Sequence, residues 1–280
     1  MNTVIYLFFL IRPLNIVICA ISVLVSSLLI NQLSSPYLYN TMCVVVCIAI
    51  SSNILNDIFD INIDRINKPH RSLPSNKVSK TTSMFFMMIF LLLGVYNVTY
   101  IRALGQYMAL FYIIPMCVLY TPLLKPVPLL GNVTIALILG SVFLFTEASL
   151  VNSVDKMLIP FFLSFGLTLI RELCKDAEDL HGDSAYKINT FPNKYGLKKT
   201  LSVIRLFSIL FCTYSITPYF FKIYSIYYLI LLILFIDLPL LYSVFIYLTN
   251  KSGPEKYANV AQVLKISTVL GIIVFISIII

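Results

Sequence analysis

The sequence predicts an all-α membrane protein that crosses the bilayer many times. Of its 280 residues, 59% are hydrophobic and only 11% are charged, whereas ordinary soluble domains carry about 25% charged residues. A soluble fold of this size would need far more polar surface to cover itself. The apolar runs are continuous rather than alternating, which favours spanning helices over a β-barrel.

Nine apolar stretches approach or exceed the length of a spanning helix, which needs about 20 residues. We therefore expect one membrane domain over residues 1–280, with nine transmembrane helices around a central cavity. The predicted spans are 14–31, 37–55, 82–101, 103–120, 129–150, 157–172, 200–220, 223–248 and 258–280.

The placement of basic residues gives these spans an orientation. If the N-terminus is cytoplasmic, the loops that follow the even-numbered spans lie inside, and they hold most of the Lys and Arg residues. Cytoplasmic loops of membrane proteins normally carry this excess. The net charge of +8 is then explained by topology and by a surface that faces anions. No basic face with base-reading residues is visible, so nucleic acid is not an expected partner.

The acidic residues gather at the predicted cytoplasmic ends of two spans. Each set, projected on a helix, forms one stripe about 60° wide. The two sets share a 4-3-4 spacing: Asn53, Asp57, Asp60 and Asp64, and Glu172, Asp176, Asp179 and Asp183. Stacked like charges destabilise a helix, and charge near a bilayer core is costly.

A divalent cation would offset both costs. Mg²⁺ in proteins commonly binds one or two carboxylates together with substrate phosphates, and Lys and Arg side chains beside the acids suit phosphate oxygens. The two sets therefore predict a site for Mg²⁺ and a diphosphate. Solvated helix ends with paired loop charges would explain a single set, but less easily two matched ones. His70 and His181 are expected to line polar loops rather than to bind metal.

Two motifs carry a resemblance to a known family. NDIFDINIDRINKPHRSLPS, residues 56–75, resembles the first motif of the UbiA superfamily of intramembrane prenyltransferases, NDxxDxxxDxxNxPxRPxPSG. KDAEDLHGD followed by NTFP resembles the second, DxxxD with a downstream TLP. RELCKDAEDLHGD is most similar to the digeranylgeranylglyceryl phosphate synthase branch. IRPLN and YTPLLKPVPLLGNVTIA resemble two further stretches, so the similarity covers nearly the whole chain.

The chain departs from the superfamily pattern at loop positions. Ser72 stands where Pro is usual, and Asn76 stands where Gly follows PS. Asn189 and Phe191 alter the segment that resembles KTLP. None of these changes removes a carboxylate, so we expect the diphosphate site to be intact and the loop shape to differ.

The resemblance implies a Mg²⁺-dependent transfer of a prenyl group from a prenyl diphosphate. The implied metal ligands are Asn56, Asp60, Asp64, Asp179 and Asp183, with Asp57 and Asp176 beside them as further catalytic residues. The implied contacts to substrate come from Arg12, Arg65, Lys68, Arg71, Tyr120, Lys125 and Lys175. The active site is expected on the cytoplasmic side of the cytoplasmic membrane, with membrane lipids around the helices.

The branch resemblance implies geranylgeranyl diphosphate as the donor and geranylgeranylglyceryl phosphate as the acceptor, which would form an ether lipid. An aromatic acceptor from quinone biosynthesis is the alternative. Two interpretations lie outside catalysis. One is a cation transporter, since intramembrane acids often mark ion paths, although the basic loops here would repel cations. The other is a binder of prenyl lipids that has lost activity.

Overall fold

All regular elements described in the computed structural model are helices, and the description covers residues 3–186 and 188–278. The chain divides into two compact units. Unit 1 comprises Met1–Leu124 and Ser141–Met157, and unit 2 comprises Lys125–Gly140 and Leu158–Ile280. Helix α8 (Leu130–Val151) contributes its first half to unit 2 and its second half to unit 1.

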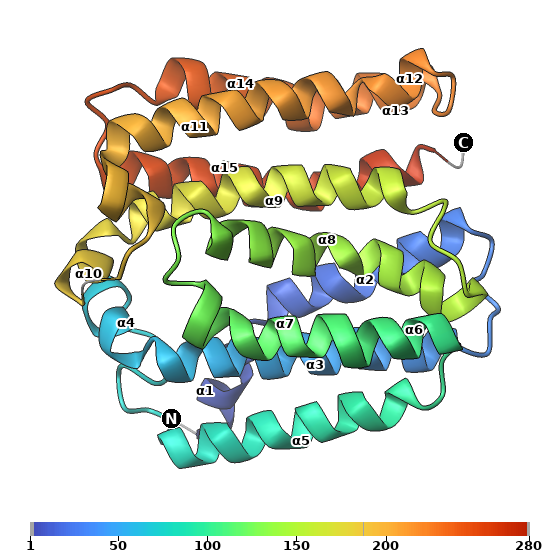
Figure 1. Cartoon of the computed structure of the whole chain (residues 1–280), viewed down its shortest axis with the longest axis horizontal. Helices are drawn as coiled ribbons and strands as arrows, with labels where there is room; N and C mark the ends of the chain where they lie inside the picture. The colour runs from blue at the N-terminus through green and yellow to red at the C-terminus, as the bar shows by residue number, and fades with distance from the viewer. Residues whose placement is uncertain (1–2, 187, 279–280) are drawn as a thin grey trace. The chain divides into compact units, whose positions relative to one another are not determined.

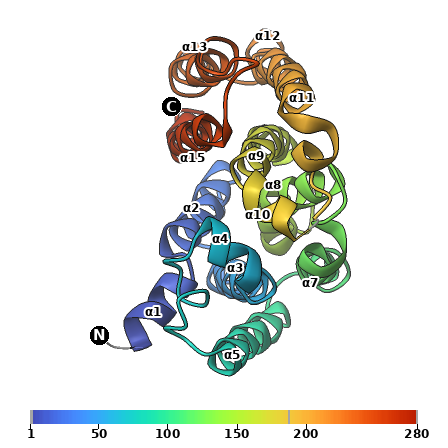
Figure 2. The same ribbon diagram turned by 90° about the vertical axis from the view of Figure 1, so that its left-hand side faces the viewer.

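Unit 1 is built around α3, which contacts α2 on one side and α5 on another (Figures 1 and 2). Its elements before α8 are α1 (Thr3–Leu10), α2 (Pro13–Leu29), α3 (Leu38–Phe59), α4 (Ile61–Asn67), α5 (Lys80–Val98), α6 (Ala103–Met108), the π-helical η1 (Ala109–Ile113), α7 (Ile114–Leu119) and the π-helical η2 (Tyr120–Leu124). Ile50, Ile54 and Ile58 of α3 form a buried cluster with Leu10 and Leu73. Leu73 thereby anchors the loop that follows α4.

Unit 2 is built around α9, which contacts α11 and α15 (Figure 2). Its elements after α8 are α9 (Leu158–Glu178), α10 (Leu180–Ala185), α11 (Phe191–Ser215), α12 (Thr217–Phe220), α13 (Ile226–Leu232), the π-helical η3 (Ile233–Asp237), α14 (Leu238–Leu241), the π-helical η4 (Tyr242–Tyr247) and α15 (Pro254–Ile276). Ile170, Leu173 and Ala177 of α9 are fully buried. This apolar face fixes the end of α9 from which the second acidic set extends.

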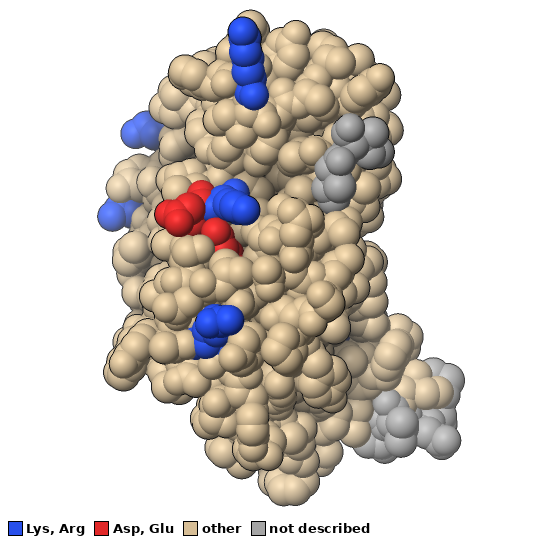
Figure 3. Space-filling model, turned by 90° about the vertical axis from the view of Figure 1, so that its right-hand side faces the viewer, with Lys and Arg blue, Asp and Glu red and all other residues tan. Residues whose placement is uncertain are grey.

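Each predicted span overlaps a long helical segment. In the described part of the chain, seven segments are long and apolar enough to cross a membrane. The other two predicted spans correspond to α2, which has 17 residues, and to α9, whose last turns are charged. The helices run past several predicted ends: α3 continues to Phe59 and α9 to Glu178. Figure 3 shows one face of the molecule, on which charged side chains are few.

The order of elements repeats along the chain. In the first copy, α2 and α3 are followed by the short α4, then by α5 and a helical segment with two π-helical stretches. In the second copy, α8, α9, the short α10 and α11 precede, after α12, a segment that again holds two π-helical stretches. This repeated order, together with the 4-3-4 spacing that the two acidic sets share, is typical of an internal duplication.

The π-helical stretches lie close to prolines. Pro115 is in the first turn of α7, Pro122 is within η2, and Pro239 is in the first turn of α14. Proline has no N–H to donate and disturbs regular α-helical bonding, and π-helical stretches are often found at functional sites. The prolines therefore explain where these two segments depart from regular helix.

Gly105 of α6 lies against the end of α8, and replacing it with Val should destabilise unit 1. A Cβ atom at Gly105 would lie 2.8 Å from the Cα atom of Ser149. This backbone is held, because the Arg102 N–H donates to the Ser149 carbonyl over 3.2 Å. Overpacking of this kind costs about 1–3 kcal/mol, so the thermal denaturation temperature in detergent should fall. Val118→Ile, which enlarges an exposed side chain, is the control; an equal effect of both changes would contradict the prediction.

Candidate active site

The first acidic set lies where α3 gives way to α4. Asp60 ends α3 with φ −84° and ψ 2°, and α4 starts at the next residue. The backbone N–H of Asp60 still bonds the Asn56 carbonyl over 2.9 Å, and that of Asp64 bonds the Asp60 carbonyl over 2.8 Å. The predicted single helix is therefore two helices joined at a bend, but the i→i−4 spacing continues through it.

Two arginines hold the buried carboxylates of this set. Asp57 and Asp64 are 6% and 4% exposed. Arg12 forms an ion pair with Asp57, and Nη1 of Arg71 lies 2.7 Å from Asp64 and 3.5 Å from Asp57. Burial raises the pKa of Asp64, and the charge and hydrogen bond of Arg71 partly offset that rise. The arginines thus neutralise carboxylates that would otherwise repel one another.

Asn56 links the bend to a second segment of unit 1. Its Nδ2 donates to Oδ2 of Asp60 over 2.9 Å. Its Oδ1 accepts a hydrogen bond of 3.4 Å from Thr121 in η2. The sequence predicted a role for Asn56 but none for Thr121, since nothing in the sequence marks a contact across 65 residues. Together these bonds orient the carboxylate of Asp60.

The two departures in the loop after α4 have structural explanations. Ser72 stands where the superfamily motif has Pro, and its hydroxyl donates to the Tyr6 carbonyl over 2.9 Å, which ties the loop to α1. Asn76 stands where Gly is usual and adopts a left-handed φ of 55°. Asn is one of the few residues that tolerates this conformation. Both substitutions are therefore compatible with a closed, ordered loop beside the acids.

The other predicted basic contacts of this region have different positions. Arg65 is exposed and donates to Asn62 on α4 over 3.3 Å, so its described hydrogen bond is not to an acid. Lys68 is close enough to lower the pKa of Asp64. Tyr120 begins η2, and Lys125 is the first residue of unit 2. Their contacts with substrate remain predictions.

The second acidic set repeats the bend of the first. Asp179 joins α9 to α10 with φ −82° and ψ 7°, nearly the angles of Asp60. The Asp179 N–H bonds the Lys175 carbonyl over 2.9 Å, and the Asp183 N–H bonds the Asp179 carbonyl over 3.1 Å. Asp183 is 4% exposed and lies in the first turn of α10. Matching bends therefore place an aspartate at each of two equivalent points of the repeat.

Glu172 and Asp176 have different partners within unit 2. Oε1 of Glu172 accepts from Arg171 over 3.0 Å, and Oε2 accepts from Lys175 over 2.7 Å. Asp176 instead accepts a hydrogen bond of 2.8 Å from Nδ2 of Asn132 at the start of α8. Burial raises the pKa of Asp176 to about 7, although Asn132 opposes the rise. The sequence predicted no role for Asn132, although it lies in the stretch YTPLLKPVPLLGNVTIA that resembles the superfamily.

A comparison with known protein families shows the family of this chain. The UbiA prenyltransferase family matches residues 15–274, which include both acidic sets. The chain belongs to this family. It is thus an enzyme, a prenyltransferase, and an integral membrane protein with several spanning helices. The cation-transporter interpretation is not supported.

Individual relatives agree with this assignment. Digeranylgeranylglyceryl phosphate synthase from Methanosphaera stadtmanae is 29% identical over 264 residues, which cover 94% of this chain and 95% of the relative. A solved structure of a digeranylgeranylglyceryl phosphate synthase aligns with a TM-score of 0.76 and 31% identity over 99% of each chain. A UbiA homologue from Archaeoglobus fulgidus, solved with GPP and Mg²⁺, shares the fold at a TM-score of 0.70 and 13% identity, covering 96% of this chain and 99% of that one.

The acidic sets of this prenyltransferase suit Mg²⁺ in their chemistry. Both offer carboxylate oxygens, and Asn56 beside the first set adds an amide oxygen; oxygen atoms are the donors that Mg²⁺ prefers. Among the residues that the structure describes, no group of three or more His, Cys, Asp and Glu gathers closely enough to hold a metal alone. Mg²⁺ usually completes its coordination with phosphate and water. The oxygen donors of the two sets therefore fit Mg²⁺ in their chemistry.

Asp176→Asn should stabilise the metal-free protein at neutral pH. A carboxylate whose pKa is raised in the folded state opposes folding as pH rises from its usual value towards about 7. Asparagine removes that charge and can keep a bond to Asn132. The thermal denaturation temperature at pH 8 should rise by ~2–4 °C for each kcal/mol recovered, and the gain should vanish at pH 4, where Asp176 is protonated. Asp155→Asn in an exposed loop is the control; a gain that persists at pH 4 would exclude this explanation.

Proposed function

We propose that this prenyltransferase transfers a geranylgeranyl group from its diphosphate to the free hydroxyl of geranylgeranylglyceryl phosphate. The product would be an ether lipid. The observation that carries the proposal is the similarity over nearly the whole chain to proteins named digeranylgeranylglyceryl phosphate synthase, including the relative from Methanosphaera stadtmanae. The motif RELCKDAEDLHGD, most similar to that branch, agrees with it.

In this proposal, the metal ligands come from both acidic sets: Asn56, Asp60, Asp64, Asp179 and Asp183. Residues 1–280 then act as one domain, and the family match through both units supports this. Bound Mg²⁺ would neutralise the diphosphate as the leaving group departs. The charges of Asp57 and Asp176 would add to the electrostatic potential around these ligands. The excess of basic residues in alternate loops supports a cytoplasmic location for the site.

Arg12 and Arg71 have a further role in this proposal. Carboxylates of the first set hold both guanidinium groups. A guanidinium has five N–H donors, so N–H groups beyond those used by Asp57 and Asp64 could bind phosphate oxygens. Lys68, Lys125 and Lys175 would add positive charge around the diphosphate, with Tyr120 as a hydrogen-bond donor and Arg65 at the periphery. A fixed guanidinium binds phosphate with little loss of conformational entropy, because its geometry is set in advance.

Product analysis tests this function. Purified protein in detergent would receive geranylgeranyl diphosphate, with geranylgeranylglyceryl phosphate and 4-hydroxybenzoate offered together, in Mg²⁺ or in EDTA. We expect an ether lipid that forms only with Mg²⁺. A prenylated ring would keep the reaction class and overturn the acceptor. Products that form equally in EDTA would overturn the metal assignment.

A further inference from the structure

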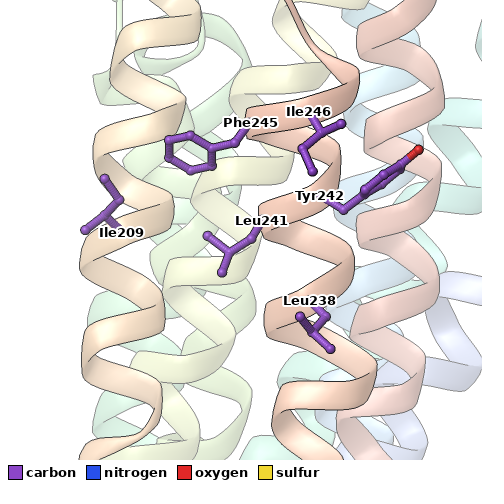
Figure 4. Close-up of a pocket in the computed structure, with 6 residues that line it drawn as sticks. All are labelled: Ile209, Leu238, Leu241, Tyr242, Phe245 and Ile246. Carbon is purple, nitrogen blue, oxygen red and sulfur yellow. The ribbon is translucent and has the colours of Figure 1, made fainter.

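Unit 2 has a groove that no residue of either acidic set lines. It has a volume of about 660 Å³ and is lined by Ile209, Leu238, Leu241, Tyr242, Phe245 and Ile246. Ligand sites commonly fall between about 300 and 1,000 Å³. In Figure 4, Leu241 and Phe245 project toward the helix that carries Ile209. The lining is nearly all hydrocarbon, which fits an alkyl or isoprenoid chain rather than a polar ligand.

One end of the groove carries a fixed cation. Arg205 lies one turn before Ile209 on α11, and its Nε and Nη2 donate to the carbonyls of Val244 and Leu248 over 3.3 and 3.1 Å. Its guanidinium lies 5.5 Å from the ring centroid of Phe245, which lines the groove. These two bonds use two of the five N–H donors of the guanidinium. The others can bind an anion at this end of the groove.

Two lysines add charge where η4 ends. Lys256 of α15 lies with its Nζ 5.2 Å from the ring centroid of Tyr247, whose hydroxyl accepts from Asn259 over 2.9 Å. Lys251 is exposed in the turn between η4 and α15, and Glu255 is the acidic residue beside them. Positive side chains therefore gather where η4 ends, and the walls of the groove are apolar.

We propose that this groove binds an anionic phospholipid of the surrounding membrane. One acyl chain of the lipid occupies the groove between α11 and the α14–η4 segment, and the lipid phosphate lies against Arg205, Lys251 and Lys256. A lipid that merely coats an apolar surface has no reason to prefer an anionic headgroup. A site built from an apolar groove and a cationic end does prefer one, since each nearby Lys or Arg attracts anionic lipid. None of its residues belongs to the proposed prenyl-transfer site.

Native mass spectrometry of the full chain tests the proposal. The protein in detergent would be offered palmitoyl-oleoyl phosphatidylglycerol or phosphatidylcholine with the same chains. We expect one retained phosphatidylglycerol and weaker retention of phosphatidylcholine. Replacing Lys251 and Lys256 together with Gln should lower the preference by about fivefold for each lysine. Equal retention of the two lipids by the unmodified protein would overturn the proposal.

A matched pair of variants tests the groove itself. Ile209→Trp fills the groove, whereas Leu210→Trp places the same bulk on a neighbouring exposed position of α11; these side chains are 50% and 55% exposed. Only Ile209→Trp should lose the retained lipid. Loss in both variants, or in neither, would refute the chain-binding part. Excess glycerol phosphate, which has no chain, should not displace the lipid; displacement would show a phosphate site instead.

Discussion

Asp60→Asn and Asp183→Asn should each lower the turnover number by about 100-fold or more. Both carboxylates are buried, and each lies at or one turn after the bend that joins its two helices. Asparagine is nearly isosteric, so the fold should remain while the negative charge that would hold Mg²⁺ is lost. The measurement is ether-lipid formation at saturating geranylgeranyl diphosphate, together with the apparent Mg²⁺ affinity.

The control for these variants is Asp155→Asn, which removes an exposed acid just before α9, whereas the second set begins towards the other end of that helix. All three proteins should enter the membrane fraction and elute alike in size-exclusion chromatography. Full activity in either Asp60→Asn or Asp183→Asn would refute the proposed metal ligands. A parallel loss in Asp155→Asn would indicate a general effect of charge removal.

Local periodicity made much of the site predictable. Helical spacing placed Asp57, Asp60 and Asp64 on one stripe, and the structure keeps that spacing through the bend at Asp60. The bend at Asp60 was not predictable from the sequence. The i→i−4 hydrogen bonds continue through it, so the spacing of polar and apolar residues is the same as in an uninterrupted helix. The same holds at Asp179, whose backbone angles nearly equal those of Asp60.

Contacts between distant segments were not predictable. Asn132 and Asp176 are 44 residues apart, and a single asparagine in an apolar stretch carries no sign of its partner. The pairing of Arg12 with Asp57 spans 45 residues, and only the family resemblance pointed to Arg12. Sequence periodicity reports the face of a helix, whereas such pairs depend on how helices pack.

Arg71→Leu should destabilise unit 1 by about 1.5–3 kcal/mol, the range for a hydrogen bond to a charged group. Asp64 is buried and would lose the Arg71 guanidinium, whose Nη1 lies 2.7 Å away. Its pKa, already raised by burial, would rise further. The penalty applies only to the ionised carboxylate, so it should be largest at alkaline pH and disappear once the pH falls below the pKa of Asp64. Chemical denaturation in detergent at pH 8 and at pH 4 measures the loss of unfolding free energy and its dependence on pH.

The double variant Arg71→Leu, Asp64→Asn separates the two roles of Arg71. If the arginine acts on stability by neutralising Asp64, the second substitution should recover most of the lost free energy at pH 8. Activity should remain lost, because the phosphate donor and a metal ligand are both absent. Arg71→Lys keeps the charge but not the planar fork that matches carboxylate and phosphate oxygens, so it should retain more stability than activity. A lysine variant with full activity would show that Arg71 serves only to hold the fold around its carboxylates.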